Sequence, residues 1–211
     1  MNPLLTVLIA SALTLASCTS CGGSKESEKV VEGENLSKNP IGFAAQMMKA
    51  GSDIEKMQKE LEQMKPVEAI SFTELLTFLP EPPAGWEGSK PQGQSNQMGE
   101  WKFTQVERRY TMGDKNIEVE ILDWAFRREL YAPFFLMASF SQESTDGYNK
   151  GIKINDDPGR EEYKTEAKDG NLSVLVGKRF LVTIRGNQIE AAELRQWWDR
   201  LNTAGLRDKA K

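Results

Sequence analysis

The stretch YKTEAKDGNLSVLVGKRFLVTI, residues 163–184, decides the fold class. It holds three runs of strand-forming residues, 163–167, 172–176 and 180–184, with Asp169-Gly170 and Gly177-Lys178 between them. β-Branched and aromatic residues favour strands, and a short connection that contains glycine is typical of a hairpin. The segment therefore predicts an antiparallel meander of three strands.

A second strand pair is expected before the meander. Apolar and polar residues alternate over 106–112 and 117–121, with a Gly-Asp turn between them, which predicts a hairpin with one solvated face. Trp101 and Phe103 fall on the opposite parity from the apolar residues that follow, so we expect a bulge or an early strand end near Gln105. Together with the meander, this hairpin predicts a sheet of about five strands.

Helical patterns surround these strands. A capping box at Ser71 and Glu74 predicts a short helix, and Asn187 is expected to cap a closing helix. We expect Trp86 to anchor a polar loop onto the core, and the paired tryptophans of the closing helix to be core residues. The remaining expectations are a buried helix over 124–140 that Pro133 begins or kinks, and polar loops over 84–100 and 147–162.

Residues 39–65 are expected to form an amphipathic helix ahead of a globular domain, 66–211. The apolar residues between 43 and 64 keep a seven-residue repeat, which suits a narrow helical stripe. We favour packing of this helix on its own domain, or as a loosely docked stalk. The alternative is an oligomer formed through a coiled coil of residues 43–64, although a dedicated coil usually runs longer.

The predicted fold class is α+β: an antiparallel sheet of about five strands packed against helices, preceded by the N-terminal amphipathic helix. Over residues 84–202 the order is a Gly-Trp loop, a hairpin, a middle helix, the hairpin LSVLVGKRFLVTI and a closing helix. This layout resembles the PsbP/Mog1-like group. The resemblance implies a non-enzymatic binding or assembly protein, as an analogy of fold that does not fix the function.

Residues 1–17 are expected to be an export signal, because their apolar run is too short to span a bilayer. Leu15-Ala16-Ser17-Cys18 closes the run and resembles the lipobox of bacterial lipoproteins. That resemblance implies cleavage before Cys18 and acylation of its thiol, so that the protein is anchored in the cell envelope. Residue 19 is Thr and not Asp, which resembles the class sent to the outer membrane in a host that has one.

The signal departs from its usual pattern in one respect, since residues 1–10 contain no Lys or Arg. Residues 18–38 are rich in Gly, Ser, Glu and Lys, which predicts a flexible tether. Cys21 could be a second acylation site, an intermolecular disulfide or a cysteine without a role, and we favour the last.

Composition excludes several functions. The 211 residues include 27 Lys and Arg against 31 Asp and Glu, a formal net charge of −4, so the surplus positive charge that nucleic-acid binding needs is missing. The histidine count is 0, which removes the commonest general base and transition-metal ligand. Both cysteines precede the expected folded region, so no disulfide can cross-link that region internally. We expect neither a metal nor a cofactor.

Two groups of residues are candidate sites. The carboxylate pairs Asp156-Asp157 and Glu161-Glu162 could run acid and base steps or hold a cation, but we interpret them as part of a solvated turn. Trp86, Trp101 and Tyr110 are candidates for a ligand pocket between sheet and helices.

The preferred hypothesis is a lipid-anchored binding or assembly module of the cell envelope, without catalysis and with a protein partner. A small-ligand carrier is the alternative. An enzyme that uses carboxylates or serine ranks third.

Overall fold

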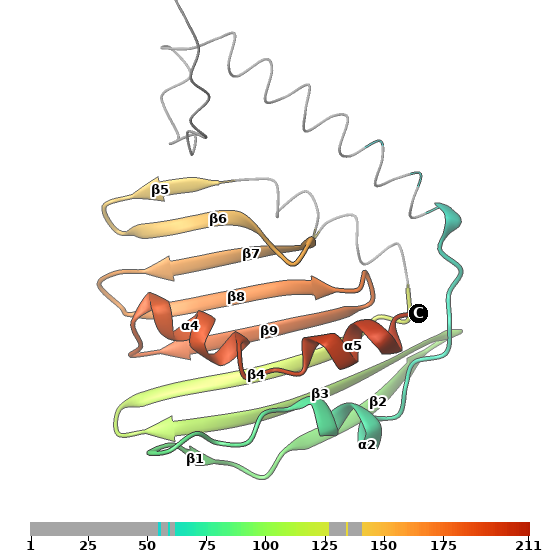
Figure 1. The fold of residues 1–211 in the computed structure, drawn as a ribbon, viewed down its shortest axis with the longest axis horizontal. Helices are drawn as coiled ribbons and strands as arrows, with labels where there is room; N and C mark the ends of the chain where they lie inside the picture. Colours follow the sequence, from blue (N-terminus) through green and yellow to red (C-terminus); the bar gives the residue numbers. More distant parts are fainter. Residues whose placement is uncertain (1–54, 56–58, 60–61, 127–133, 135–140) are drawn as a thin grey trace, which may run out of the picture. The chain divides into compact units, whose positions relative to one another are not determined.

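The computed structural model describes residues 55, 59, 62–126, 134 and 141–211 (Figure 1). In this part of the chain, nine strands form one antiparallel sheet in the order β1-β3-β4-β9-β8-β7-β6-β5, and β2 also pairs with β3. The strands are β1 (Glu87–Gly88), β2 (Gln92–Met98), β3 (Trp101–Met112), β4 (Lys115–Asp123), β5 (Gln142–Ser144), β6 (Gly147–Ile154), β7 (Asp157–Lys164), β8 (Asp169–Val176) and β9 (Phe180–Asn187).

Short helices cover one face of this sheet (Figure 1). They are α2 (Phe72–Leu75), the 3₁₀ turn η1 (Leu76–Phe78), α4 (Ala191–Trp198) and α5 (Thr203–Lys209). Helix α2 contacts β2 and β3, while α4 contacts β8 and β9. The main core lies between these helices and the sheet, because strand alternation places the apolar side chains of β3, β4, β8 and β9 on this face.

The predicted fold class is wrong in its balance of elements. Instead of about five strands packed against helices, the described residues form a nine-stranded sheet with three short α-helices. The segments 84–100 and 147–162, expected as loops, contain β1, β2, β6 and most of β7. Polar side chains obscured the strand pattern of these segments. β1, β2 and β6 have no buried residue among those described, and the alternate positions that β7 buries include Asp157 and Glu161. Backbone pairing with a neighbouring strand holds such segments in the sheet.

Two of the expected helices lie largely outside the described residues. These are the N-terminal helix over 39–65 and the buried helix over 124–140. Where the second was expected to begin, Ala125 and Phe126 form a turn with positive φ angles of 49° and 56°. That backbone conformation does not begin an α-helix.

The expected bulge near Gln105 is also wrong. β3 pairs residue by residue with β2 from Trp101 to Glu107 and with β4 from Thr104 to Met112, and neither register is interrupted. Trp101 and Phe103 therefore lie on the face opposite Tyr110 because of regular alternation within one strand.

The meander and the turns around it follow the prediction with two shifts. Gly113-Asp114 and Gly177-Lys178 are turns, as expected, but the first turn of the meander is residues 165–168, ahead of Asp169-Gly170. Ser71 caps α2, where its Oγ accepts a hydrogen bond from the Glu74 amide at 3.2 Å. The closing helix begins later than predicted: Asn187 ends β9, and Glu190 is the N-cap of α4.

The apolar residues expected on one side of the closing helix are confirmed as core residues. Leu194, Trp197, Trp198 and Leu201 are all buried. A second, smaller apolar cluster of Trp124, Phe134 and Leu175 contacts Met64, Leu122 and Leu181. Leu122, Leu175 and Leu181 alternate with the main core residues along β4, β8 and β9, so they point from the opposite face of the sheet.

A buried ion pair ties the end of β4 to the start of β9. Asp123 is fully buried and Arg179 is 6 % exposed. The guanidinium donates from Nε to Oδ1 at 2.9 Å and from Nη2 to Oδ2 at 2.8 Å. The carboxylate also accepts from the amides of Ile70 and Ala125, and Arg179 donates to the carbonyls of Glu68 and Lys209. The pair thereby joins the segment before α2 to the C-terminal helix.

Candidate functional site

Part of the sheet face opposite the helices carries polar side chains from four neighbouring strands. We call this surface the polar face. Alternation along β3 places Gln105, Glu107 and Arg109 there, because Val106 and Tyr110 point into the core. The surface consists of Gln92 and Gln94 on β2, Gln105, Glu107 and Arg109 on β3, Glu118 and Glu120 on β4, and Arg185 on β9.

One half of the polar face is held together by glutamine side chains. Gln94 Nε2 donates to Gln105 Oε1 at 3.4 Å, which is a long contact. Gln105 Nε2 in turn donates to Glu120 Oε1 at 2.6 Å. An ionised acceptor strengthens a hydrogen bond, so Glu120 fixes the orientation of the Gln105 amide. Because the Gln105 Nε2 group donates to Glu120, the Gln105 Oε1 atom is turned toward Gln94 on β2.

The other half is an ion-pair network centred on Arg185. Its Nη2 lies 2.7 Å from Glu120 Oε2, and its Nη1 donates to Glu118 Oε1 at 2.8 Å. Glu118 Oε2 accepts from Arg109 Nε at 2.8 Å. Partial burial alone would raise the pKa of Glu118, but hydrogen bonds from Arg109 and Arg185 lower it below its usual value. A continuous chain of polar contacts therefore crosses β2, β3, β4 and β9.

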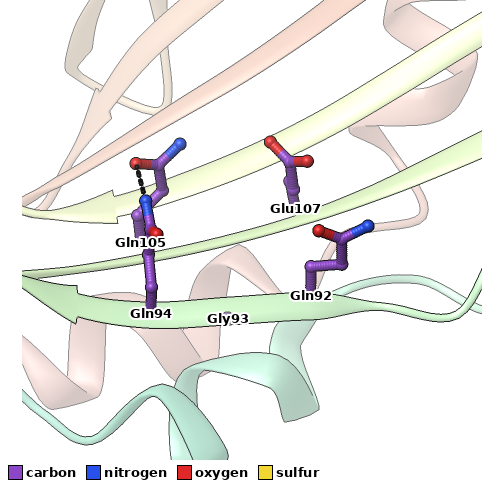
Figure 2. A pocket seen from close by; sticks show the side chains of 5 residues that line it. All are labelled: Gln92, Gly93, Gln94, Gln105 and Glu107. Atoms are coloured by element: carbon purple, nitrogen blue, oxygen red, sulfur yellow. Dashed lines mark hydrogen bonds between the residues drawn. The ribbon is translucent and has the colours of Figure 1, made fainter.

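A shallow hollow of about 140 Å³ opens at the glutamine half of the polar face (Figure 2). The side chains of Gln92 and Gln94 stand on β2, and those of Gln105 and Glu107 stand on β3 beside them. Gly93 lies between the two β2 glutamines, and a Cβ there would come within 3.1 Å of Phe72 on α2. α2 thus packs beneath this end of the sheet and supports the strand pair that forms the hollow.

The hollow offers the hydrogen-bonding amides of three glutamines and one carboxylate, that of Glu107. A glutamine amide both donates and accepts hydrogen bonds, while the Glu107 carboxylate when ionised only accepts them. Such groups suit a partner surface that offers its own amides, hydroxyls or backbone groups. Trp101 and Phe103 lie farther along the same face of β3 and are half-buried.

Two of the four carboxylates considered as catalytic candidates, Asp157 and Glu161, are buried and do not lie in a solvated turn. Asp157 is 8 % and Glu161 4 % exposed, both within β7. Asp157 accepts from the Gly177 amide at 3.0 Å and pairs with Arg207 at 2.7 Å. Of the four candidates, only Asp156 lies in the turn, where its φ is 67°.

Glu161 is surrounded by donors. Tyr148 Oη donates to it at 2.6 Å, Arg195 Nε donates at 2.7 Å, and Lys150 Nζ lies 3.4 Å away. Burial alone would raise the pKa of Glu161, but the hydrogen bond from Tyr148, together with Arg195 and Lys150, lowers it below its usual 4.5. Burial and the facing carboxylate raise the pKa of Tyr148 above its ordinary value. Both groups therefore hold their protonation states near neutral pH, which suits a structural role.

The aromatic ligand candidates do not come together as one pocket. Trp86 and Tyr110 both pack against Trp197, with ring centroids 5.1 Å and 4.4 Å away. Trp101 lies on the opposite face of the sheet. Tyr110 is fully buried, donates to the Pro80 carbonyl at 2.6 Å, and has its pKa raised to about 12 by burial. Trp86 is confirmed as an anchor on the core.

Sequence reasoning missed the glutamines of β2. Gln92, Gln94 and Asn96 stand at alternate positions, which is a strand period, but they lie in a polar segment that was expected to be a loop. The network around Arg185 was also missed, because it depends on the pairing of β9 with β4. No local pattern specifies which distant strand a segment joins.

The expected lipidation site, Cys18, lies outside the described residues, and so do the expected oligomerisation residues 43–64 except 55, 59 and 62–64. In the part of the chain that the structure describes, no helix is long and apolar enough to cross a membrane. Within the same ranges, no three His, Cys, Asp or Glu side chains gather as a group able to hold a metal ion. No family model matches the chain, and no curated protein or solved structure matches it either.

Proposed function

We propose that this chain is a lipid-anchored binding or assembly module of the bacterial cell envelope, without catalytic activity, that holds a protein partner on its polar face. The observation that carries the proposal is the chain of polar contacts across β2, β3, β4 and β9. The contacts keep donors and acceptors in fixed positions before a partner arrives. Such preorganisation lowers the entropy that a complex loses on formation.

The sequence supports the anchoring half of the proposal through the lipobox-like segment that ends at Cys18. A lipid anchor confines the protein to a surface, since each buried methylene contributes about 0.8 kcal/mol to membrane binding. Partners in the same membrane then meet it at a high effective concentration. A modest binding face suffices under those conditions.

The two alternatives receive less support. A ligand carrier would use the space around Trp86 and Tyr110, but these rings pack directly against Trp197. An enzyme would use the carboxylates of β7, but Asp157 and Glu161 are engaged by arginines. Neither alternative uses the side chains of the polar face.

Anchoring is tested by the mass of the protein extracted from membranes. The proposal expects a chain that begins at Cys18 and carries acyl mass, and it expects Cys18→Ser to leave the membrane fraction. Cys21→Ser is the matched control and should remain membrane-bound. An intact Met1, or a Cys18 without acyl mass, would refute the anchoring.

Binding is tested by affinity purification from envelopes solubilised in mild detergent, followed by reconstitution with the purified partner. The double variant Gln92→Lys/Glu107→Lys places two cations in the hollow and should weaken binding at least tenfold. Gln142→Lys/Glu143→Lys makes the same substitutions on the exposed strand β5 and should bind as the wild type does. Equal binding by both double variants would remove the polar face from the proposal.

A further inference from the structure

Among the described residues, β2 is an edge strand whose own sequence lacks the usual protection against pairing with another strand. In the part of the chain that the structure describes, it pairs with β3 along one side and with no strand along the other, over all seven of its residues. An edge strand presents unpaired N–H and C=O groups, and proteins usually protect such edges with charged residues, proline, bulges or shortness. The sequence QGQSNQM contains no charge and no proline, and its register with β3 has no bulge.

The opposite edge of the sheet differs in these respects. β5 has only three residues and carries Glu143. β1, which lies beyond β2 along β3, has two residues. Among the edge strands that the structure describes, β2 is therefore the one that is both long and neutral. Gln92, Gln94, Ser95 and Gln97 are exposed.

The chemistry of β2 is complementary to itself. An antiparallel pair of β2 strands related by a two-fold axis through Ser95 would use all seven residues, and it would place Gln94 of each copy opposite Asn96 of the other. Amide side chains pair well in this arrangement, because each both donates and accepts hydrogen bonds. The chain as a whole carries a net charge of −4, which opposes association, but the paired strands themselves contribute no charge.

We propose that the β2 edge binds the β2 edge of a second copy of this chain. The two sheets then join across the two-fold axis, and the two polar faces lie side by side on the same surface of the joined sheet. An isologous contact of this kind closes on itself and yields a dimer, not a filament. The inference shares Gln92 and Gln94 with the polar face, but its test is separate from that of the proposed partner, because trapping through Ser95→Cys reports on a second copy at the β2 edge.

The first experiment is disulfide trapping of the full chain in native membranes treated with a mild oxidant. All variants carry Cys21→Ser, and this parent chain measures the background. Ser95→Cys should form a dimer, because residues directly opposite in an antiparallel pair have Cβ atoms about 4.5–5.5 Å apart. Ser144→Cys on β5 is the matched control, and we expect at least tenfold less dimer from it.

The second experiment separates self-pairing from random collision by adding charges to the Ser95→Cys chain. Gln94→Lys/Asn96→Lys sets lysine opposite lysine twice and should reduce trapping at least tenfold. Gln94→Lys/Asn96→Glu sets lysine opposite glutamate at the same positions and should restore it. Circular dichroism of all variants verifies the fold.

Three outcomes would overturn the proposal. The first is equal trapping by Ser95→Cys and Ser144→Cys, and the second is equal trapping by the two charge variants. The third is a Ser95→Cys adduct whose mass is not twice that of the chain, which would assign the edge to a different protein.

Discussion

Asp123 and Arg179 show how much one buried pair can hold in this molecule. Each oxygen of the fully buried carboxylate accepts from Arg179 and from one backbone amide. Desolvation of two charges is costly, so a buried pair is tolerated when its hydrogen bonds are complete. Removal of one partner leaves the other charge buried and unpaired.

We therefore expect Asp123→Ala to lower the free energy of unfolding by about 3–5 kcal/mol. Glu81→Ala is the control, because Glu81 is 85 % exposed in its pair with Arg108 and should change stability by less than about 1 kcal/mol. Urea denaturation measures both values. A loss below 1 kcal/mol for Asp123→Ala would show that the pair contributes no more than a surface contact.

The lowered pKa of Glu161 predicts that the free energy of unfolding depends on pH. Its pKa is lowered in the folded protein, so the unfolded chain binds the proton more readily. The contribution of Glu161 is complete above its usual pKa of 4.5 and is lost as the pH falls toward the lower folded value. Glu161→Gln should therefore lose less stability than the wild type between pH 6 and pH 3.

Tyr148→Phe removes one of the donors that lower this pKa, so its loss of stability over the same pH range should be intermediate. Chemical denaturation at each pH measures the three proteins. Curves for Glu161→Gln and the wild type that stay parallel over the whole range would contradict the assignment.

The sequence predicts the chemical type of these residues but not their surroundings. Asp157 and Glu161 read as solvated because most acidic residues are exposed. Their partners Arg207 and Arg195 lie 50 and 34 positions away in the C-terminal helices. Only the packing of these helices on β7 and β8 creates the buried pairs, so no local pattern could reveal them.

Among the elements, the junction of β9 with the closing helix is closely packed around Gly186. A Cβ on Gly186 would lie 2.8 Å from Ile189 Cγ1 and 2.9 Å from Ile117 Cδ1. Contacts under 3 Å require a shift of the surroundings, and here the neighbours are fully buried core residues. The glycine is therefore needed for the close approach of the chain after β9 to β4.

We expect Gly186→Ala to destabilise the protein by about 1–3 kcal/mol through overpacking. Gly113 is the control for glycine replacement in general. Its φ is +59° and no atom lies within 4 Å of the Cβ position, so Gly113→Ala should cost only the backbone strain, about 1 kcal/mol. Thermal unfolding of both variants measures the difference. A Gly186→Ala protein as stable as the wild type would show that the junction can relax.

Elements with apolar alternation were predictable, and polar elements were not. The hairpin β3–β4 and the strands β8 and β9 follow the sequence pattern, since their core residues recur at every second position. β2 and β6 contain few such residues. They are strands because their backbones pair with β3 and β7. This pairing exists only in the assembled sheet, so the local sequence does not reveal it.

On the scale of the whole molecule, stability should be unevenly distributed over the sheet. β4, β8 and β9 carry much of the buried core, while all three residues of β5 are exposed and β6 has no buried residue. Amides with many buried neighbours exchange with solvent only when the whole protein unfolds, whereas peripheral elements open locally.

Hydrogen exchange followed by mass spectrometry should therefore find the highest protection in β4, β8 and β9 and lower protection in β5 and β6. Denaturant added below the unfolding midpoint distinguishes local from global opening. Uniform protection across all nine strands would mean that the sheet opens as one unit.

The pairing of β4 with β9 has a consequence for the order in which the protein is made. β4 ends at residue 123 and β9 begins at residue 180, so the centre of the sheet joins segments separated by more than fifty residues. Ribosomes deliver the N-terminal side first, so one long edge of β4 stays without its partner until β9 emerges, more than fifty residues later. Non-local pairing of this kind slows folding. Closure of the core around β4 is thus delayed until β9 has been synthesised, and a nascent chain that has not yet reached β9 keeps an open edge in the middle of its sheet.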